Sequence, residues 1–203
     1  MKQKEMDKLV RHFDTYFQQS DCIVLHPIVD MEPHIDALLY KPNKKYPYWK
    51  LVSMGASDYK MPAPKNRPLG DRNEYIMFID PNEDMNDKAV AGWYYQQLQG
   101  VARYPATSKT FITYGHSVEW TPDEGEELVC AFLEFPQIVE DTGILRCRLG
   151  LTKTVICLQI VLLNRAETDR LLEIGPEQFS YFLYPETGND LHFLCQRRRS
   201  EKF

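Results

Sequence analysis

The chain has 203 residues, of which 43% are hydrophobic and 26% charged, and these proportions are typical of a globular protein with a substantial core. The formal net charge of −5 argues against nucleic acid as the main partner, because neutralising phosphates requires clustered Lys and Arg. No run of about 18 apolar residues is present and the first 19 residues lack the apolar core of a signal peptide, so we expect neither a membrane span nor secretion, but a cytoplasmic protein.

The first predicted element is a helix over about residues 2–19, where apolar side chains recur at helical spacing. A short apolar run at residues 22–26 then ends at Pro27. Strands are predicted where apolar runs are bounded by turn residues, at 34–40, 48–54 and 75–79. Prolines between the second and third of these strands predict an irregular loop over residues 57–72.

A second helix is predicted over residues 89–101, with Asn86 as its N-cap. Pro105 separates this helix from the next strands. These strands are predicted at 110–114, 128–135 and 153–163. The last of them is the most apolar stretch of the chain, so we expect it at the centre of the sheet.

The C-terminal part begins with Asn164-Arg165-Ala166-Glu167, which predicts a capping box and a third helix that closes near Gly175. Pro176 suits the first turn of a fourth helix. A last strand is predicted at 191–195, before a basic tail at 196–203. Strands outnumber helices without regular alternation, which predicts an α+β fold, and no linker interrupts a single domain over residues 1–203.

The five cysteines are odd in number, widely spaced and without a C-x-x-C pair, which favours reduced thiols over disulfides or a zinc site. The histidines are a second set of possible metal ligands. His34 and Asp36 would share one face of a strand, and His26 lies eight residues before His34 across a proline bend. Because no tight local pair such as H-x-x-x-H is present, we predict structural histidines and no metal.

Gly55-Ala56-Ser57-Asp58 follows a predicted strand in the way a serine nucleophile elbow does. That motif needs a second glycine two residues after the serine, and Tyr59 stands there. We predict instead a tight turn, in which Gly55 has an unusual backbone conformation and Asp58 accepts bonds from nearby amides. No phosphate-binding loop is present, so we predict no catalytic residue and no cofactor.

Four short blocks resemble the suppressor-of-fused domain: residues 34–36 (HID), 49–58 (WKLVSMGASD), 61–62 (MP) and 73–75 (NEY). The apolar run at 155–163 and the Asn164-Arg165-Ala166-Glu167 helix start are similar to a second region of that family, so the resemblance covers about residues 24–180. It implies a mixed, largely antiparallel sheet flanked by helices and a role in binding another protein. The motif residues that it marks are expected to hold the fold: His34, Asp36, Gly55, Ser57, Asp58 and Glu74.

The chain is too short for the additional C-terminal domain of the animal members, and resembles the stand-alone bacterial type, many of which are considered immunity proteins against a secreted toxin. An acidic segment would suit capture of a basic toxin domain. Its candidate partner-binding residues are Glu119, Asp123, Glu124, Glu126 and Glu127. Two alternatives stay open: a regulatory partner of a transcription factor, and an enzyme with a pocket around His34, Asp36, Ser57 and Asp58.

Overall fold

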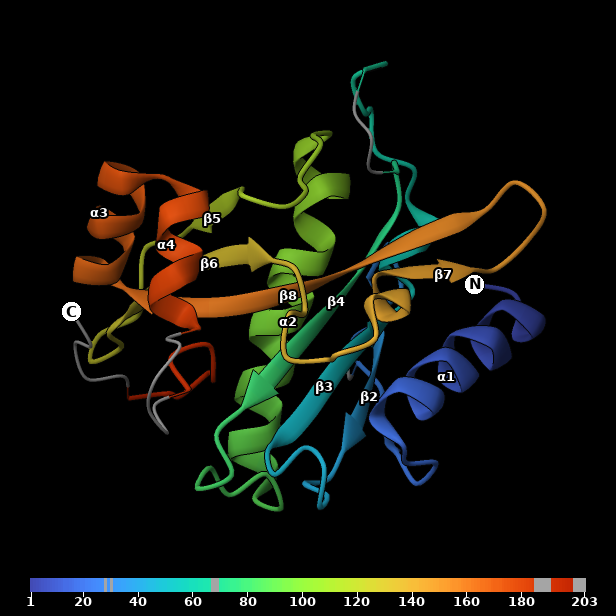
Figure 1. The fold of residues 1–203 in the computed structure, drawn as a ribbon, viewed down its shortest axis with the longest axis horizontal. Coiled ribbons are helices and arrows are strands. Elements are labelled where there is room, and N and C mark those ends of the chain that lie inside the picture. Colours follow the sequence, from blue (N-terminus) through green and yellow to red (C-terminus); the bar gives the residue numbers. More distant parts are fainter. Residues whose placement is uncertain (28, 30, 67–69, 185–190, 199–203) are drawn as a thin grey trace.

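A mixed sheet of eight strands forms the centre of the structure, a computed structural model that describes residues 1–27, 29, 31–66, 70–184 and 191–198 (Figure 1). The strands follow the order β1-β2-β3-β4-β8-β6-β5, and β7 pairs with β8. Their bounds are β1 Ile23–Leu25, β2 Asp36–Tyr40, β3 Trp49–Met54, β4 Asn73–Ile79, β5 Ser117–Glu119, β6 Leu128–Glu134, β7 Arg146–Arg148 and β8 Thr154–Asn164. β4 and β8 run parallel and the other described pairs are antiparallel, which confirms the predicted α+β class and the largely antiparallel sheet.

β8 is the central strand that its composition predicts. It pairs with β4 on one side and with β6 and β7 on the other. All of its residues after Thr154 are buried. A strand covered on both faces requires a nearly continuous apolar run, and this strand has one.

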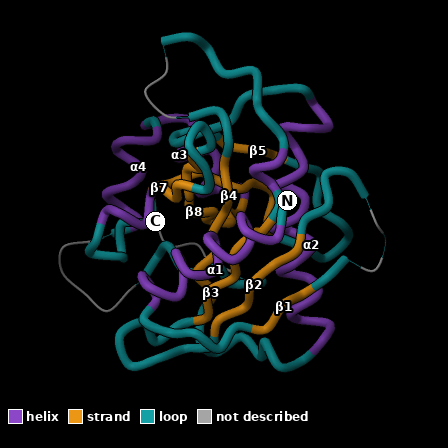
Figure 2. Tube along the Cα trace, turned by 90° about the vertical axis from the view of Figure 1, so that its right-hand side faces the viewer, coloured by secondary structure: helices purple, strands orange, loops and turns teal. Residues whose placement is uncertain are grey.

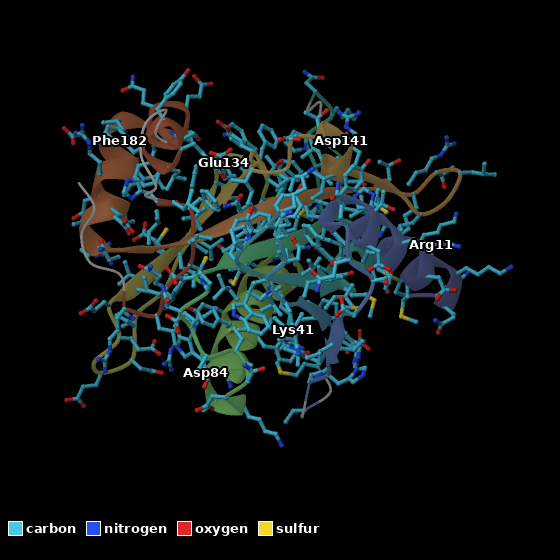
Figure 3. The ribbon with its side chains drawn as sticks, turned by 60° about the horizontal axis from the view of Figure 1, so that its bottom comes forward. Arg11, Lys41, Asp84, Glu134, Asp141 and Phe182 are labelled. Atoms are coloured by element: carbon cyan, nitrogen blue, oxygen red, sulfur yellow. The ribbon has the colours of Figure 1, made fainter. Side chains whose placement is uncertain are left out.

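Helices cover both faces of the sheet (Figures 1 and 2). On one face lie α1 Gln3–Phe17, α3 Arg165–Ile174 and α4 Pro176–Leu183, which share a core that includes Phe13, Phe17 and Phe179. On the other face lies α2 Lys88–Ser108, which contributes Tyr94 and Leu98 to a second core. Charged side chains such as Arg11 and Asp84 lie at the periphery (Figure 3). None of the helices in the described ranges combines the length and the apolar character that crossing a membrane requires.

The predicted ends of α1 and α3 and the predicted start of α4 are confirmed. Asn164 accepts a hydrogen bond from the Glu167 amide at 2.9 Å, and Glu167 accepts one from the Asn164 amide at 3.1 Å, which completes the capping box. Gly175 ends α3 with a positive φ, and Pro176 begins α4. The N-terminal helix also lies within two residues of its predicted bounds.

Four local predictions are wrong. The N-cap of α2 is Asp87, whose side chain accepts from the Ala89 amide, and not Asn86. The helix also continues through Pro105 to Ser108, because a proline already has a helical φ and here lies buried on the packed face of α2.

Residues 110–114 form no strand, since their backbone bonds to other groups: the Ile112 carbonyl accepts from the Asn73 side chain and the Thr113 amide donates to His116. The predicted strand at 191–195 is reduced to one bridge between Ile79 and Cys195. Of the basic tail, residues 199–203 lie outside the described residues.

Candidate functional site

The motif turn after β3 is built around the buried carboxylate of Glu74. Its Oε1 atom accepts hydrogen bonds from the Gly55 and Ser57 amides, both at 3.0 Å, and its Oε2 atom accepts one from the Ser53 hydroxyl at 2.5 Å. The Ser53 oxygen in turn accepts from the Tyr75 amide at 2.8 Å. Burial raises the pKa of Glu74 above its ordinary value, and the three donors oppose that rise. An acid with no exposed surface is tolerated in the sheet because each oxygen has donors.

Gly55 has the unusual backbone conformation that its position predicts, with φ +125°. A side chain there would overlap the carbonyl oxygen of His34, so the turn and the start of β2 are in close backbone contact. Arg72 closes the other end of the turn by donating to the Ser57 and Asp58 carbonyls at 2.6 and 2.9 Å. The turn is thereby held from both sides.

The prediction for Asp58 is wrong. Glu74, and not Asp58, accepts the amides of the turn, because Glu74 comes from the neighbouring strand and reaches the turn from inside the sheet. The Asp58 carboxylate instead accepts a bond from Lys153 at 2.8 Å and contacts the α-amino group of Met1. These cations lower the pKa of Asp58 although partial burial, the largest single influence, raises it.

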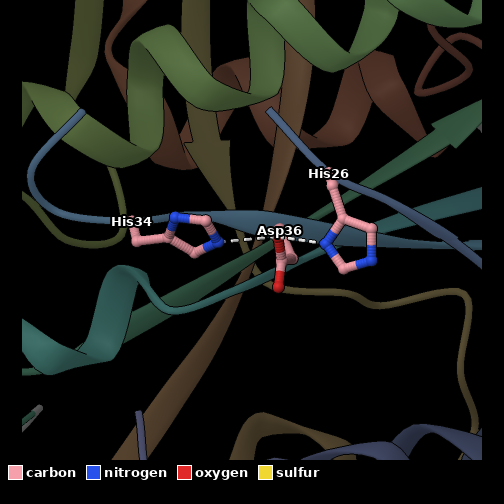
Figure 4. A group of neighbouring side chains, drawn as sticks. All are labelled: His26, His34 and Asp36. Carbon is pink, nitrogen blue, oxygen red and sulfur yellow. Dashed lines mark hydrogen bonds and ion pairs between the residues drawn. The ribbon is translucent and has the colours of Figure 1, made fainter. Parts of the chain in front are cut away.

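His26, His34 and Asp36 converge at the start of β2, although sequence reasoning dismissed them as ligands for lack of a tight pair (Figure 4). His26 Nδ1 lies 2.9 Å from Asp36 Oδ1, and His34 Nε2 lies 3.0 Å from the same oxygen. The two imidazoles are half or more exposed, while the Asp36 side chain is only 12% exposed. Two imidazole nitrogens and a carboxylate oxygen are a donor set that divalent transition metals accept.

The four residues of the enzyme alternative do not line one pocket. Ser57 is fully buried, and its amide belongs to the Glu74 turn. Asp58 lines a hollow together with Glu32 and Thr107, and His34, Asp36 and Ser57 are not among the residues that line it. His34 and Asp36 belong to the histidine cluster. A serine nucleophile and its base must lie within hydrogen-bond reach of each other. Among the described residues, no hydrogen bond joins the buried Ser57 hydroxyl to His34, Asp36 or Asp58.

The acidic segment lies on the β5–β6 hairpin, at the opposite edge of the sheet from β1. Two of its five residues have side-chain partners: Glu119 pairs with Arg165 at 3.1 Å, and Glu126 accepts from the Trp93 indole at 2.7 Å. The remaining three are exposed, and no ion pair within the described ranges involves them: Asp123, Glu124 and Glu127.

The first residues of the basic tail lie next to the acidic hairpin. Arg197 pairs with Glu83 at 3.3 Å, and Arg198 lines the same hollow as Glu126, a space of about 500 Å³. The free acidic surface is therefore the tip of the hairpin, while its base is partly neutralised.

Sequence reasoning missed the residues of α2 that hold the start of β2. The Ile35 carbonyl accepts from Tyr95 at 2.7 Å and from Gln99 at 3.0 Å, and the Pro33 carbonyl accepts from Arg103 at 3.3 Å. The four-residue spacing of these helix side chains was a usable signal, because residues four apart share one helix face.

The family model for the suppressor of fused protein (SUFU) matches residues 31–195. No curated protein sequence matches the chain. Solved structures with the same fold include the following three. A chain in the Sufu–Fu complex is 16% identical with a TM-score of 0.66, and the alignment covers 97% of this chain and 91% of that one.

A putative SUFU homolog from Neisseria gonorrhoeae FA 1090 is 14% identical with a TM-score of 0.66, over 98% of this chain and 97% of the homolog. Drosophila Suppressor of Fused is 16% identical with a TM-score of 0.68, over 97% of this chain but 51% of the Drosophila chain, so this chain spans about half of that protein. Since the family model covers well over half of the sequence and the fold agrees, the chain belongs to the suppressor of fused family.

Proposed function

We propose that this chain is a protein-binding module and that it catalyses no reaction. The observation that carries the proposal is its membership in the suppressor of fused family, together with a fold that matches, over 97% of the chain, a protein crystallised as the Sufu–Fu complex. Fu is the partner of that crystallised protein. For this chain we propose the same kind of activity, with a partner of its own.

The geometry of the motif residues supports a scaffold role over catalysis. Glu74 and Ser57 are fully buried, and Glu74 is occupied by donors from the turn. A general base needs access to the proton that it removes, and a nucleophile needs access to its substrate. In the described structure neither side chain has that access.

The partner that we propose is a cognate toxin that this chain neutralises as an immunity protein in the bacterial cytoplasm. The tip of the β5–β6 hairpin supports this, because Asp123, Glu124 and Glu127 are exposed acids that a basic toxin domain would contact. Complementary charge speeds the encounter and fixes its orientation more than it adds affinity. The acidic tip would therefore act mainly on the rate at which the toxin is captured.

Affinity purification of the tagged chain from its native cells, followed by mass spectrometry, tests the proposal. We expect one stoichiometric partner that survives a moderate salt wash. Recovery of a toxin domain supports the immunity role. Recovery of a transcription factor contradicts that role and supports the alternative of a regulatory partner. Recovery of no specific protein, from cells shown to express candidate toxins, contradicts the binding module itself.

Charge reversal then tests the hairpin tip. The triple variant Asp123→Lys, Glu124→Lys and Glu127→Lys leaves Glu126 in place, because Glu126 holds Trp93. We expect the association rate to fall by about tenfold or more at low salt and the salt dependence to weaken.

A matched control changes the net charge by the same amount elsewhere, at three other exposed acids: Asp7, Asp169 and Glu173. An association rate that falls equally in both triple variants assigns the effect to net charge and removes the hairpin from the interface. An unchanged association rate in the hairpin variant also removes the hairpin from the interface.

A further inference from the structure

The pairing of β1 with β2 explains why His26, His34 and Asp36 meet. In the antiparallel register Leu25 faces Ala37, so the next position along the ladder places His26 opposite Asp36. His34 precedes Asp36 by two residues and therefore lies on the same side of the strand. Directly opposite residues have their Cβ atoms about 5 Å apart, close enough for the side chains to meet. The pairing of β1 with β2 therefore brings the cluster together.

The three donor atoms lie close to the spacing that a metal ion requires. His26, His34 and Asp36 each offer one ligand atom, and these three atoms all lie within 4.8 Å of one another. Zinc bonds of about 2.0–2.1 Å at tetrahedral angles place neighbouring ligand atoms about 3.3 Å apart. The observed nitrogen–oxygen distances of 2.9 and 3.0 Å would have to open by a few tenths of an ångström. The two imidazole nitrogens, which lie within 4.8 Å of each other, would have to lie about 3.3 Å apart, and binding therefore requires the exposed imidazoles to rotate.

The backbone that carries two of these ligands is held on every side. Tyr95 and Gln99 bind the Ile35 carbonyl, and Arg103 binds the Pro33 carbonyl. Gly55 leaves the space that the His34 carbonyl occupies. Ligands on a fixed backbone lose little freedom when an ion binds, which is what an effective metal site needs.

We infer that His26, His34 and Asp36 bind one divalent transition-metal ion of the zinc class. The two imidazole nitrogens that face Asp36 would ligate the ion, each ring remaining neutral with its proton on the other nitrogen and any additional proton released to water, and Asp36 Oδ1 would be the third ligand. Because both imidazoles are exposed, the ion would keep a coordination position open to solvent, which water or an added ligand completes. This site is independent of the proposed toxin partner, and either can fail without the other.

The test uses the full chain without a histidine tag, treated with a chelator and then titrated with ZnCl2 by calorimetry. We expect one Zn²⁺ per chain. His26→Gln is the decisive variant, because its side chain is 68% exposed and its replacement leaves the core untouched. We expect it, and likewise His34→Gln and Asp36→Asn, to weaken zinc binding by at least about tenfold. Circular dichroism confirms that each variant is folded.

His116→Gln is the control, since His116 lies beside β5 at the far edge of the sheet and should leave zinc affinity unchanged. Co²⁺ serves as a second probe, because its visible spectrum reports the ligand geometry directly, and we expect the bands of the wild-type complex to disappear in His26→Gln. Absence of zinc binding to the wild type overturns the inference. Binding that is equal in the wild type and in His26→Gln also overturns it, since the ion would then lie elsewhere.

Discussion

Replacing Glu74 tests whether its carboxylate holds the motif turn. Glu74→Ala removes the acceptor of three buried donors: the Gly55 amide, the Ser57 amide and the Ser53 hydroxyl. Glu74→Gln keeps the shape of the side chain and one carbonyl oxygen, which can still accept both amides. Its amide group can donate to the Ser53 oxygen in place of the lost bond. The two variants therefore separate the loss of the acceptor from the loss of the charge.

The expected magnitudes differ clearly. A buried donor without a partner costs about 1–3 kcal/mol, so three of them cost about 3–9 kcal/mol. The released desolvation penalty of the carboxylate offsets part of this cost, and we expect a net loss of about 3–6 kcal/mol. The glutamine variant, in which the donors keep partners, should lose about 1 kcal/mol. Domains of this kind have a free energy of unfolding of about 5–15 kcal/mol, so the alanine variant should be strongly destabilised or partly unfolded.

Urea unfolding followed by tryptophan fluorescence measures both losses. With a urea slope of about 2 kcal/mol per molar, the alanine variant should unfold about 1.5–3 M earlier than the wild type, and the glutamine variant about 0.5 M earlier. A loss below about 1 kcal/mol in Glu74→Ala would refute the assigned role of the carboxylate. Equal losses in the two variants would mean that the charge, and not the acceptor geometry, stabilises the turn.

The same pair gives a pH dependence with a defined sign. Burial raises the pKa of Glu74 above its ordinary value of 4.5, so the folded protein takes up a proton more readily than the unfolded chain. This contribution is fully present below the pKa of the unfolded chain and is lost as the pH rises through the pKa of the folded state. The wild type should therefore gain stability relative to Glu74→Gln on acidification from pH 8 towards pH 4.5, and a constant difference would contradict the raised pKa.

Two further variants test the packing around the turn and in the sheet. Gly55→Ala should cost at least about 3 kcal/mol in unfolding experiments because of the overlap with His34, whereas Gly125→Ala, with a positive φ of +85° but open space, should cost about 1 kcal/mol; equal costs would remove the steric argument. Burial lowers the pKa of Lys50 to about 8, so the wild type gains stability between pH 8 and 10.5, where the unfolded chain keeps its proton longer. The stability of the wild type relative to Lys50→Met should rise by up to about 3 kcal/mol between pH 7 and pH 10.5, and a pH-independent difference would contradict the lowered pKa.

The parts of the fold that the sequence predicts are those with a local cause. The capping box of Asn164 and Glu167 is formed by two residues three apart, and the buried strand β8 is visible as an unbroken apolar run. Pro105 shows the limit of a local rule: a proline usually ends a helix, but the packed face of α2 extends past it. The bonding of residues 110–114 depends on Asn73, which lies far away in the sequence, and no local pattern reports it.

The candidate site was less predictable because its contacts join different strands. The shared face of His34 and Asp36 follows from their spacing, but the position of His26 depends on the register of β1 against β2, which a three-residue strand does not specify from sequence. The same holds for Glu74, which reaches the turn from β4. Asp58 was predicted to accept the amides of the turn because it is adjacent to them in the sequence, but the carboxylate that reaches these amides in the structure is that of Glu74.

The motif turn and the histidine cluster depend on one another through the backbone of His34. Gly55 can approach the His34 carbonyl because it has no side chain, and Glu74 fixes Gly55 through its amide. Tyr95 and Gln99 hold the following carbonyl from the opposite direction. A buried residue can therefore determine where an exposed imidazole lies. We therefore expect Glu74→Gln, which preserves the turn, to leave zinc affinity at the cluster intact. We expect any folded variant that displaces Gly55 to weaken zinc affinity although every ligand is still present.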